Sequence, residues 1–225
     1  MSISRIFIAR HGQIASGEFL NNNPNLPKND PVLSDLGIKQ AELLAEELKR
    51  LNFNGEIFSS PFRRTLMTAQ AAAKLLNCPI YPCASLREVV KVQDSLKNFR
   101  GLTVEEIQNL FPETAKDATL VYPWWQNDVE TSEDVAERVK PTIEKALEAG
   151  KDILLVGHGA SVFASFRVLM KKTEFHFEDP LPQWYNCALT QFKVENNTVT
   201  PITVNSVSHL PATMLTQNYK YALVK

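Results

Sequence analysis

The stretch RIFIARHG, residues 5–12, decides the fold of this chain. Residues 5–9 form a short apolar run, which is typical of a strand that is covered on both faces of a sheet. The run stops at Arg10, His11 and Gly12. Arginine is among the residues least often buried without a partner, so an arginine at the end of a buried strand indicates an anionic group beyond it.

Strand-like and helix-like segments alternate from there onward. Strands are predicted at 56–60, at 79–82, in the 152–161 run and, late in the chain, over 188–194 and 200–207; helices are predicted at 34–53, 64–77, 101–118, 131–149 and 162–170. Ser34 and either Thr131 or Ser132 are the expected N-caps of two helices. This alternation predicts an α/β fold, a three-layer sandwich whose mainly parallel sheet has helices on both faces.

Charge and composition exclude several partner classes. The chain has 225 residues, 24 Lys and Arg against 25 Asp and Glu, and a formal net charge of −1, so no global basic field favours nucleic acid or an anionic membrane. We find no leader-like or transmembrane-length apolar run and expect a single cytoplasmic domain over 1–225. Three cysteines without a CxxC spacing argue against a disulfide framework or a zinc ribbon.

The candidate chemistry lies where three predicted strands end. Arg10 and His11 follow the first, Ser59 and Ser60 end the second, and His158 follows the 152–157 run between two glycines. Ligands of such sheets bind beyond the carboxyl ends of the strands. Guanidinium groups match the oxygens of a tetrahedral dianion, whereas they repel a divalent cation and disfavour a protonated His11. We therefore expect no metal, and a neutral imidazole that acts as nucleophile.

An ordered set of motifs resembles the histidine phosphatase superfamily, also called the phosphoglycerate mutase-like family. The set comprises Arg10-His11-Gly12, LSDLGIKQA (33–41), SSPFRRT (59–65), Leu86-Arg87-Glu88 and Gly157-His158-Gly159. The resemblance covers roughly residues 5–190 and is of the branch with RHG and GHG. It implies a phosphoglycerate mutase-like fold with residues about 90–129 as an insertion over the active site.

The resemblance also implies roles for individual residues. His11 would accept the phosphoryl group, while Arg10, Arg64 and His158 would hold its oxygens. The SPxxR spacing counted from Ser60 selects Arg64, not Arg63. Glu88 would protonate the leaving oxygen and later activate water. His11, Glu88 and His158 are thus the predicted catalytic residues, and no cofactor is expected.

Other positions have alternative interpretations. Gln13, Trp124 and Trp125 are candidate substrate contacts, although buried packing is the ordinary role of such an aromatic pair. Glu88 is alternatively a surface carboxylate or an ion-pair partner of Arg87 or Lys91. His176 and His209 are interpreted as structural. The residues after the RHG motif also depart from the pattern of many members, which have Glu-Thr in place of Gln-Ile at 13–14 and often an asparagine in place of Gly17.

The sequence therefore predicts a metal-independent phosphomonoester hydrolase of the histidine acid phosphatase-like type, acting through a phosphohistidine on His11. Its substrate would be a small-molecule phosphomonoester or a phosphoprotein, with the oligomeric state open. One alternative is a phosphoglycerate mutase, which usually has more cations over its site than the four in the 90–129 segment: Lys91, Lys97, Arg100 and Lys116. The other is a non-catalytic phospholigand-binding protein.

Overall fold

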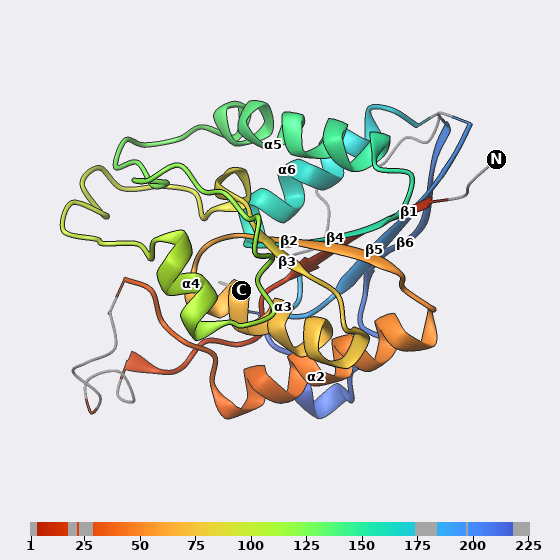
Figure 1. The fold of residues 1–225 in the computed structure, drawn as a ribbon, viewed down its shortest axis with the longest axis horizontal. Helices are drawn as coiled ribbons and strands as arrows, with labels where there is room; N and C mark the ends of the chain where they lie inside the picture. The colour runs from red at the N-terminus through yellow and green to blue at the C-terminus, as the bar shows by residue number, and fades with distance from the viewer. Residues whose placement is uncertain (1–3, 18–21, 23–28, 174–183, 197, 218–225) are drawn as a thin grey trace, which may run out of the picture.

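A six-stranded sheet in the order β3-β2-β4-β1-β5-β6 organises the chain (Figure 1). The computed structural model describes residues 4–17, 22, 29–173, 184–196 and 198–217. The parallel strands are β1 (Ser4–Arg10), β2 (Gly55–Ser59), β3 (Ile80–Pro82) and β4 (Asp152–Gly157). β5 (Leu189–Glu195) runs antiparallel to β1, and β6 (Thr198–Ser206) antiparallel to β5. The prediction of a mainly parallel sheet is confirmed.

Helices cover both faces of the sheet (Figure 1). α2 (Asp35–Arg50) and α3 (Arg63–Leu76) lie on one face, and α5 (Ser132–Glu148) and α6 (Gly159–Met170) on the other. Successive side chains of β1 alternate between the two cores: Phe7 packs with α2 and α3, while Ile6 and Ile8 pack with α5 and α6. The three-layer arrangement is thus confirmed. None of the helices in the described residues has the length and apolarity needed to cross a bilayer.

Two predicted helix boundaries were wrong. Only Val104–Leu110 (α4) of the predicted 101–118 helix forms, because Pro112 disfavours helical geometry at the preceding residue. α6 begins at Gly159, three residues before the predicted start, because the Ser161 hydroxyl accepts the His158 backbone N–H at 2.9 Å and satisfies the first turn. His158 is therefore the N-cap of α6 and is fixed at the end of β4.

The predicted N-caps are confirmed. The Ser34 hydroxyl accepts the Gly37 N–H at 3.0 Å at the start of α2, and Thr131 forms a capping box with Asp134 at the start of α5. Two 3₁₀ turns complete the described structure, η1 (Ala84–Leu86) and η2 (Ala212–Met214).

Gly12 and Gly37 let the loop after β1 touch α2. A methyl group at Gly37 would lie 2.1 Å from the Gln13 carbonyl oxygen, and one at Gly12 would lie 2.5 Å from the Gly37 carbonyl oxygen. Because the contacted atoms belong to the backbone, a methyl group at either position would force the loop or the helix to shift. The glycines of both motifs are therefore needed for the close approach that fixes the loop after His11.

The segment 90–129 extends beyond the ends of β2 and β3, on the left of Figure 1, and includes α4. Its two ends are joined where the Glu130 N–H donates to the Val90 carbonyl at 2.9 Å. Phe99 and Trp124 of this segment pack on Phe62, which directly precedes α3. The segment thus reaches the carboxyl edge of the sheet, where the functional residues gather.

Candidate active site

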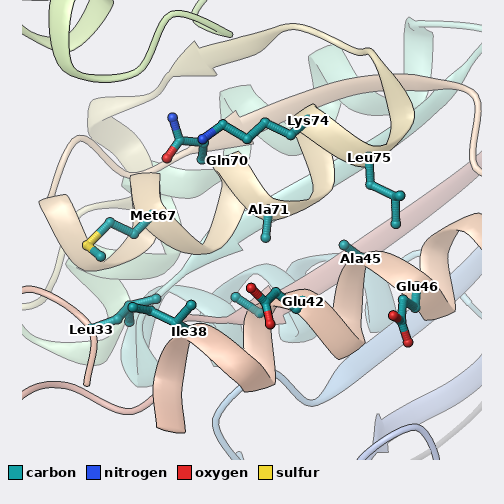
Figure 2. Close-up of a pocket in the computed structure, with 11 residues that line it drawn as sticks. Leu33, Ile38, Glu42, Ala45, Glu46, Met67, Gln70, Ala71, Lys74 and Leu75 are labelled. Carbon is teal, nitrogen blue, oxygen red and sulfur yellow. The ribbon is translucent and has the colours of Figure 1, made fainter. Parts of the chain in front are cut away.

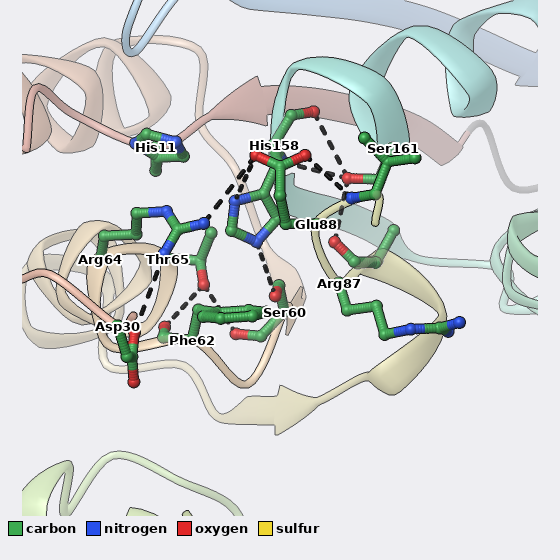
Figure 3. Close-up of polar contacts among 12 residues, drawn as sticks. His11, Asp30, Ser60, Phe62, Arg64, Thr65, Arg87, Glu88, His158 and Ser161 are labelled. Atoms are coloured by element: carbon green, nitrogen blue, oxygen red, sulfur yellow. Dashed lines mark hydrogen bonds and ion pairs between the residues drawn. The ribbon is translucent and has the colours of Figure 1, made fainter. Parts of the chain in front are cut away.

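The strand ends bring His11 and His158 together. Parallel pairing places Arg10 of β1 opposite Gly157 of β4, so the residues that follow them lie side by side. The two imidazole centroids are 5.3 Å apart at an interplanar angle of 61°, and Figure 3 shows both rings beside Arg64 and Glu88. Both histidines are buried. Two motifs separated by most of the chain therefore form one site.

The His11 ring is held in one tautomer. Its Nδ1 lies 2.7 Å from the Gly12 carbonyl oxygen, which can only accept a hydrogen bond. Nδ1 therefore carries the proton and Nε2 keeps a free electron pair. Burial, followed by the charges of Arg64 and Arg10, lowers the pKa of His11 well below its ordinary value. The structure thus supplies a neutral imidazole with a nucleophilic nitrogen.

A hydrogen-bond network from distant parts of the chain fixes the loop that carries His11. The Asn186 amide donates to the His11 carbonyl at 2.7 Å, and its oxygen accepts the Thr216 hydroxyl at 3.0 Å. Gln40 on α2 donates to Thr216 and accepts the Gln13 N–H at 2.8 Å. Sequence reasoning missed Asn186 and Thr216; only Gln40 lies in a quoted motif. This network fixes the backbone on both sides of Gly12.

Among the described residues, one ring nitrogen of His158 has no hydrogen-bond partner. Its Nε2 lies 2.9 Å from the Ser60 hydroxyl, while its buried Nδ1 is the nitrogen without such a partner and lies 3.6 Å from Glu88 Oε2. Burial, then the charge of Arg64, lowers its pKa well below the ordinary value. Nδ1 is therefore placed to hydrogen-bond an oxygen of a ligand in the space shared with Glu88.

Arg64, and not its neighbour, faces the two histidines. Its side chain is 9% exposed, and its guanidinium stacks 4.6 Å from the Phe62 ring centroid. Its nitrogens lie 3.8 Å from oxygens of Asp30 and of Glu88, beyond hydrogen-bond range. The Arg63 side chain is 22% exposed and turns to Asp30 instead. The SPxxR count therefore selected the arginine that the fold directs into the site (Figure 3).

Arg10 is the second buried guanidinium near His11. It is 8% exposed, and its Nη1 donates to the Trp184 carbonyl at 2.6 Å. Its charge contributes to the lowered pKa of both histidines, after burial and Arg64. Two buried guanidinium groups therefore act on the histidines at these strand ends.

Asp30 is a buried carboxyl that sequence reasoning missed. It accepts the Arg63 N–H at 2.8 Å and so caps α3, whose N-cap Phe62 has no side chain for this purpose. Burial, only partly offset by the charge of Arg64, raises its pKa to about 6. No sequence pattern marked Asp30 as buried, because it lies in a proline-rich loop without hydrophobic periodicity. Asp30 connects this loop to the start of the helix that bears Arg64.

Glu88 faces the site rather than Arg87 or Lys91, the neighbours considered above as its ion-pair partners. Its Oε2 lies 3.8 Å from Arg64 Nη2 and 3.6 Å from His158 Nδ1, and its side chain is 36% exposed (Figure 3). Arg87 pairs with Glu130 instead. Among the three interpretations of Glu88, the geometry favours a carboxylate beside the reacting group that is reachable by water.

The aromatic residues of the 121–128 segment divide into two kinds. Trp124 is only 4% exposed and donates its indole N–H to the Leu102 carbonyl. Its ring centroid lies 5.0 Å from that of Phe62, and the Phe62 centroid lies 5.2 Å from that of His158. Trp124 therefore supports the site from behind Phe62, as in the packing interpretation. The ring centroid of Trp125 lies 5.3 Å from that of Trp124, and Trp125 is partly exposed, so the substrate contact predicted for it stays a prediction.

Gln13 is engaged by α2. Its amide oxygen accepts the Ser34 hydroxyl at 2.9 Å, and its backbone N–H donates to Gln40. The substrate contact predicted for Gln13 stays a prediction, because these bonds hold the side chain at the N-terminus of α2.

The described residues offer no cluster of metal ligands. No three His, Cys, Asp or Glu side chains within them are grouped to hold an ion. All three cysteines are free thiols. His209 lies 3.0 Å from the Cys187 carbonyl and lines no part of the site, in accord with a structural role. His176 lies outside the described residues.

A hollow lies on the surface between α2 and α3 (Figure 2). It has a volume of about 570 Å³, and its walls are largely aliphatic, with Glu42, Glu46 and Lys74 also lining it. None of the described residues that line it is a histidine or an arginine. The chemistry of the strand ends is therefore absent from this groove.

The buried histidines make stability depend on pH. In the unfolded chain each titrates near 6.5, whereas the folded state resists protonation. As the pH falls below about 6.5, the unfolded state binds more protons and the free energy of unfolding decreases, by up to ~1.4 kcal/mol per pH unit for each histidine. Asp30 acts in the opposite direction between 3.8 and about 6, because its pKa is raised.

Urea unfolding at several values between about pH 5 and 7 measures this slope. Because Asp30 is common to both proteins, His11→Ala is expected to reduce the slope of the wild type by up to ~1.4 kcal/mol per pH unit. Equal slopes for the two proteins would mean that His11 is protonated in the folded state.

The fold and the site define a class of protein: an α/β sandwich with two histidines and two buried arginines at the carboxyl edge of its sheet. The chain belongs to the histidine phosphatase superfamily (branch 1), whose profile matches residues 6–207. The family predicted from the ordered motifs is thereby confirmed.

Individual relatives agree with this assignment. Phosphoserine phosphatase 1 of Hydrogenobacter thermophilus is 37% identical over 84 residues, which cover 37% of each chain. A phosphoglycerate mutase of Schizosaccharomyces pombe is 28% identical over 71% of this chain and 76% of its own. The chain spans less than two thirds of the length of the first curated relatives it matches.

The solved structures agree on the fold. The ecdysone phosphate phosphatase of Bombix mori superposes with a TM-score of 0.70 at 16% identity, over 90% of this chain and 93% of its own. The phosphoglycerate mutase-like fold predicted from the motifs is thereby confirmed.

Proposed function

We propose that the protein is a metal-independent phosphomonoester hydrolase that works through a phosphohistidine on His11. The observation that carries this proposal is the His11 ring, whose Nδ1 lies 2.7 Å from the Gly12 carbonyl oxygen and which lies beside Arg64, Glu88 and His158 (Figure 3). Its Nε2 would be the free nucleophilic nitrogen. Phosphoryl transfer chiefly requires an in-line nucleophile and fixed positive charge around the equatorial oxygens. Both requirements match this arrangement.

The first step would transfer the phosphoryl group to the enzyme. His11 Nε2 forms a bond to phosphorus as the bond from phosphorus to the leaving oxygen breaks. Protonated Glu88 gives its proton to that oxygen, so that an alcohol leaves. Arg10, Arg64 and the free Nδ1 of His158 would hold the remaining oxygens.

The second step would return the enzyme to its starting state. Glu88, now a carboxylate, takes a proton from water as the water oxygen bonds to phosphorus. The bond from phosphorus to His11 Nε2 breaks, and orthophosphate leaves. The half-exposed position of Glu88 supports this role, because water can reach its carboxylate.

Phosphomonoesters with an apolar or aromatic portion would be favoured if the leaving group reaches the partly exposed Trp125. Relatives are named for phosphoserine and for ecdysone phosphate, so a small-molecule monoester is the substrate class that we propose. The similarity to a phosphoglycerate mutase makes phosphoryl transfer between two positions of a phosphoglycerate the second candidate.

A panel of phosphomonoesters assayed with a chelator present tests the proposal. We expect orthophosphate release from several esters, and alkaline quenching, which preserves the acid-labile bond from phosphorus to nitrogen, followed by mass spectrometry should find phosphate on His11. Isomerisation of a phosphoglycerate without net release would favour the mutase. Binding without turnover of any ester would favour a non-catalytic phospholigand-binding protein.

A further inference from the structure

We propose that Arg87, Glu130 and Arg138 form a buried ion network whose task is to position Glu88 for proton transfer. These are positioning residues, since the described contacts place none of them against His11. The inference rests on the proposed function, in which Glu88 is the proton donor.

The network is centred on Glu130, whose side chain is 2% exposed. Its Oε1 accepts Arg87 Nη2 and Arg138 Nε, each at 2.8 Å, and its Oε2 accepts Arg138 Nη2 at 3.2 Å. Both arginine side chains are 10% exposed. Charged groups with so little solvent access hold each other in a fixed geometry.

The network forms hydrogen bonds with the backbone on both sides of Glu88. On the N-terminal side, Arg138 Nη1 donates to the carbonyls of Ser85 and Arg87. On the C-terminal side, Glu130 Oε2 accepts the Val90 N–H at 3.2 Å, and the Glu130 N–H donates to the Val90 carbonyl. The backbone is therefore held on both sides of Glu88, and both attachments depend on the carboxylate of Glu130.

Glu88 depends on this backbone support because its own side chain is weakly held. Its carboxylate accepts only the Val89 N–H at 3.0 Å among the hydrogen bonds described, while Arg64 and His158 lie at 3.8 and 3.6 Å. A displacement of about 1 Å in a catalytic group can lower a rate on the order of 100-fold. The place of this carboxylate is thus set by residues 85–90.

Stability alone does not account for the network. Burying three charges carries a desolvation cost, and apolar side chains of the same volume often stabilise a protein equally well. An ion network with several directed hydrogen bonds specifies a backbone position that apolar packing would leave less defined. The geometry of two bonds to carbonyls and one to an N–H is what a positioning role needs.

The test compares Glu130→Gln and Arg138→Lys with Glu137→Gln, a control on α5, the helix of Arg138, whose side chain is 77% exposed. Glutamine keeps the size of Glu130 but cannot balance two arginines. A lysine has one nitrogen in place of the planar fork whose three nitrogens bond Glu130 and two carbonyls. Each variant is assayed with an alkyl phosphate, whose leaving oxygen needs a proton, and with an activated aryl phosphate, which leaves readily as an anion.

We expect Glu130→Gln and Arg138→Lys to lose at least about 10-fold more kcat/KM on the alkyl than on the aryl phosphate, because kcat/KM reports the first step, in which only the alkyl leaving oxygen needs the proton of Glu88. Glu88→Gln should show the same bias more strongly, and Glu137→Gln none. Stabilisation by orthophosphate in thermal unfolding should be kept in both network variants, because the groups proposed to bind phosphate are unchanged.

Equal losses on the two substrates would overturn the inference and leave the network a structural role only. A Glu88→Gln variant without substrate bias would instead contradict the proposed acid, whatever the network does. If Glu130→Gln does not fold, Arg138→Lys decides, since it keeps every charge of the network.

Discussion

Replacing His11 with alanine is expected to abolish turnover, lowering kcat/KM by a factor on the order of 10⁴ or more. The substitution removes the one nitrogen that the Gly12 hydrogen bond leaves unprotonated beside Arg64 and His158. Water that enters the vacated space is a poorer nucleophile, and the variant cannot form the covalent phosphohistidine. Steady-state assays of wild type and variant on the most active ester, with chelator, measure the loss.

The matched control is His209→Ala, which removes a histidine that contacts the Cys187 carbonyl outside the site. It should keep the wild-type kcat/KM within a few-fold, provided that its thermal unfolding shows a folded protein. His11→Ala should still be stabilised by orthophosphate, because Arg10, Arg64 and His158 remain. Equal turnover by His11→Ala and wild type would eliminate the proposed nucleophile.

The alternation of strands and helices could be predicted because local patterns determine it. The apolar run at 5–9, the Ser34 cap and the helical spacing after it each act over a few residues. The convergence of His11 and His158 followed from a general rule about parallel strands. Local signals combined with one topological rule thus located the central pair of the site.

The antiparallel direction of β5 had no local signal. Its alternating pattern, with Phe192 and Val194 buried on one face, fits either direction of pairing. The direction is seen only in the pairing of β5 with the edge of β1, which is a property of the assembled sheet. Alternation along a strand reports which face is buried and nothing about its partner.

The supporting residues could not be found from sequence because their partners are remote. Asn186 reaches His11 across 175 positions, and Glu130 joins Arg87 across 43. Polar residues that support a site carry no periodicity and resemble surface residues until the fold brings them together. Asp30 illustrates this: it lies in an irregular loop, yet it is buried at the start of α3.

The two adjacent arginines at the start of α3 should differ sharply in their importance. Arg64→Ala is expected to lower kcat/KM by about 100- to 1,000-fold, because a preorganised cation that faces the transferred phosphoryl group is removed. Arg63→Ala should cost less than about 5-fold, because the Arg63 side chain is partly exposed and turned to Asp30. Its backbone N–H, which Asp30 accepts, is kept in the variant.

Arg64→Lys separates charge from geometry at the same position. A lysine keeps the positive charge but loses the planar fork that matches two phosphate oxygens and stacks on Phe62. We therefore expect an intermediate loss of kcat/KM, and thermal stabilisation by orthophosphate that falls in the order wild type, Arg64→Lys, Arg64→Ala. Arg63→Ala should be stabilised as much as the wild type. A larger loss of kcat/KM in Arg63→Ala than in Arg64→Ala would contradict the assignment of Arg64 as the phosphate-binding arginine, because it would place the phosphate on the solvent side of Asp30.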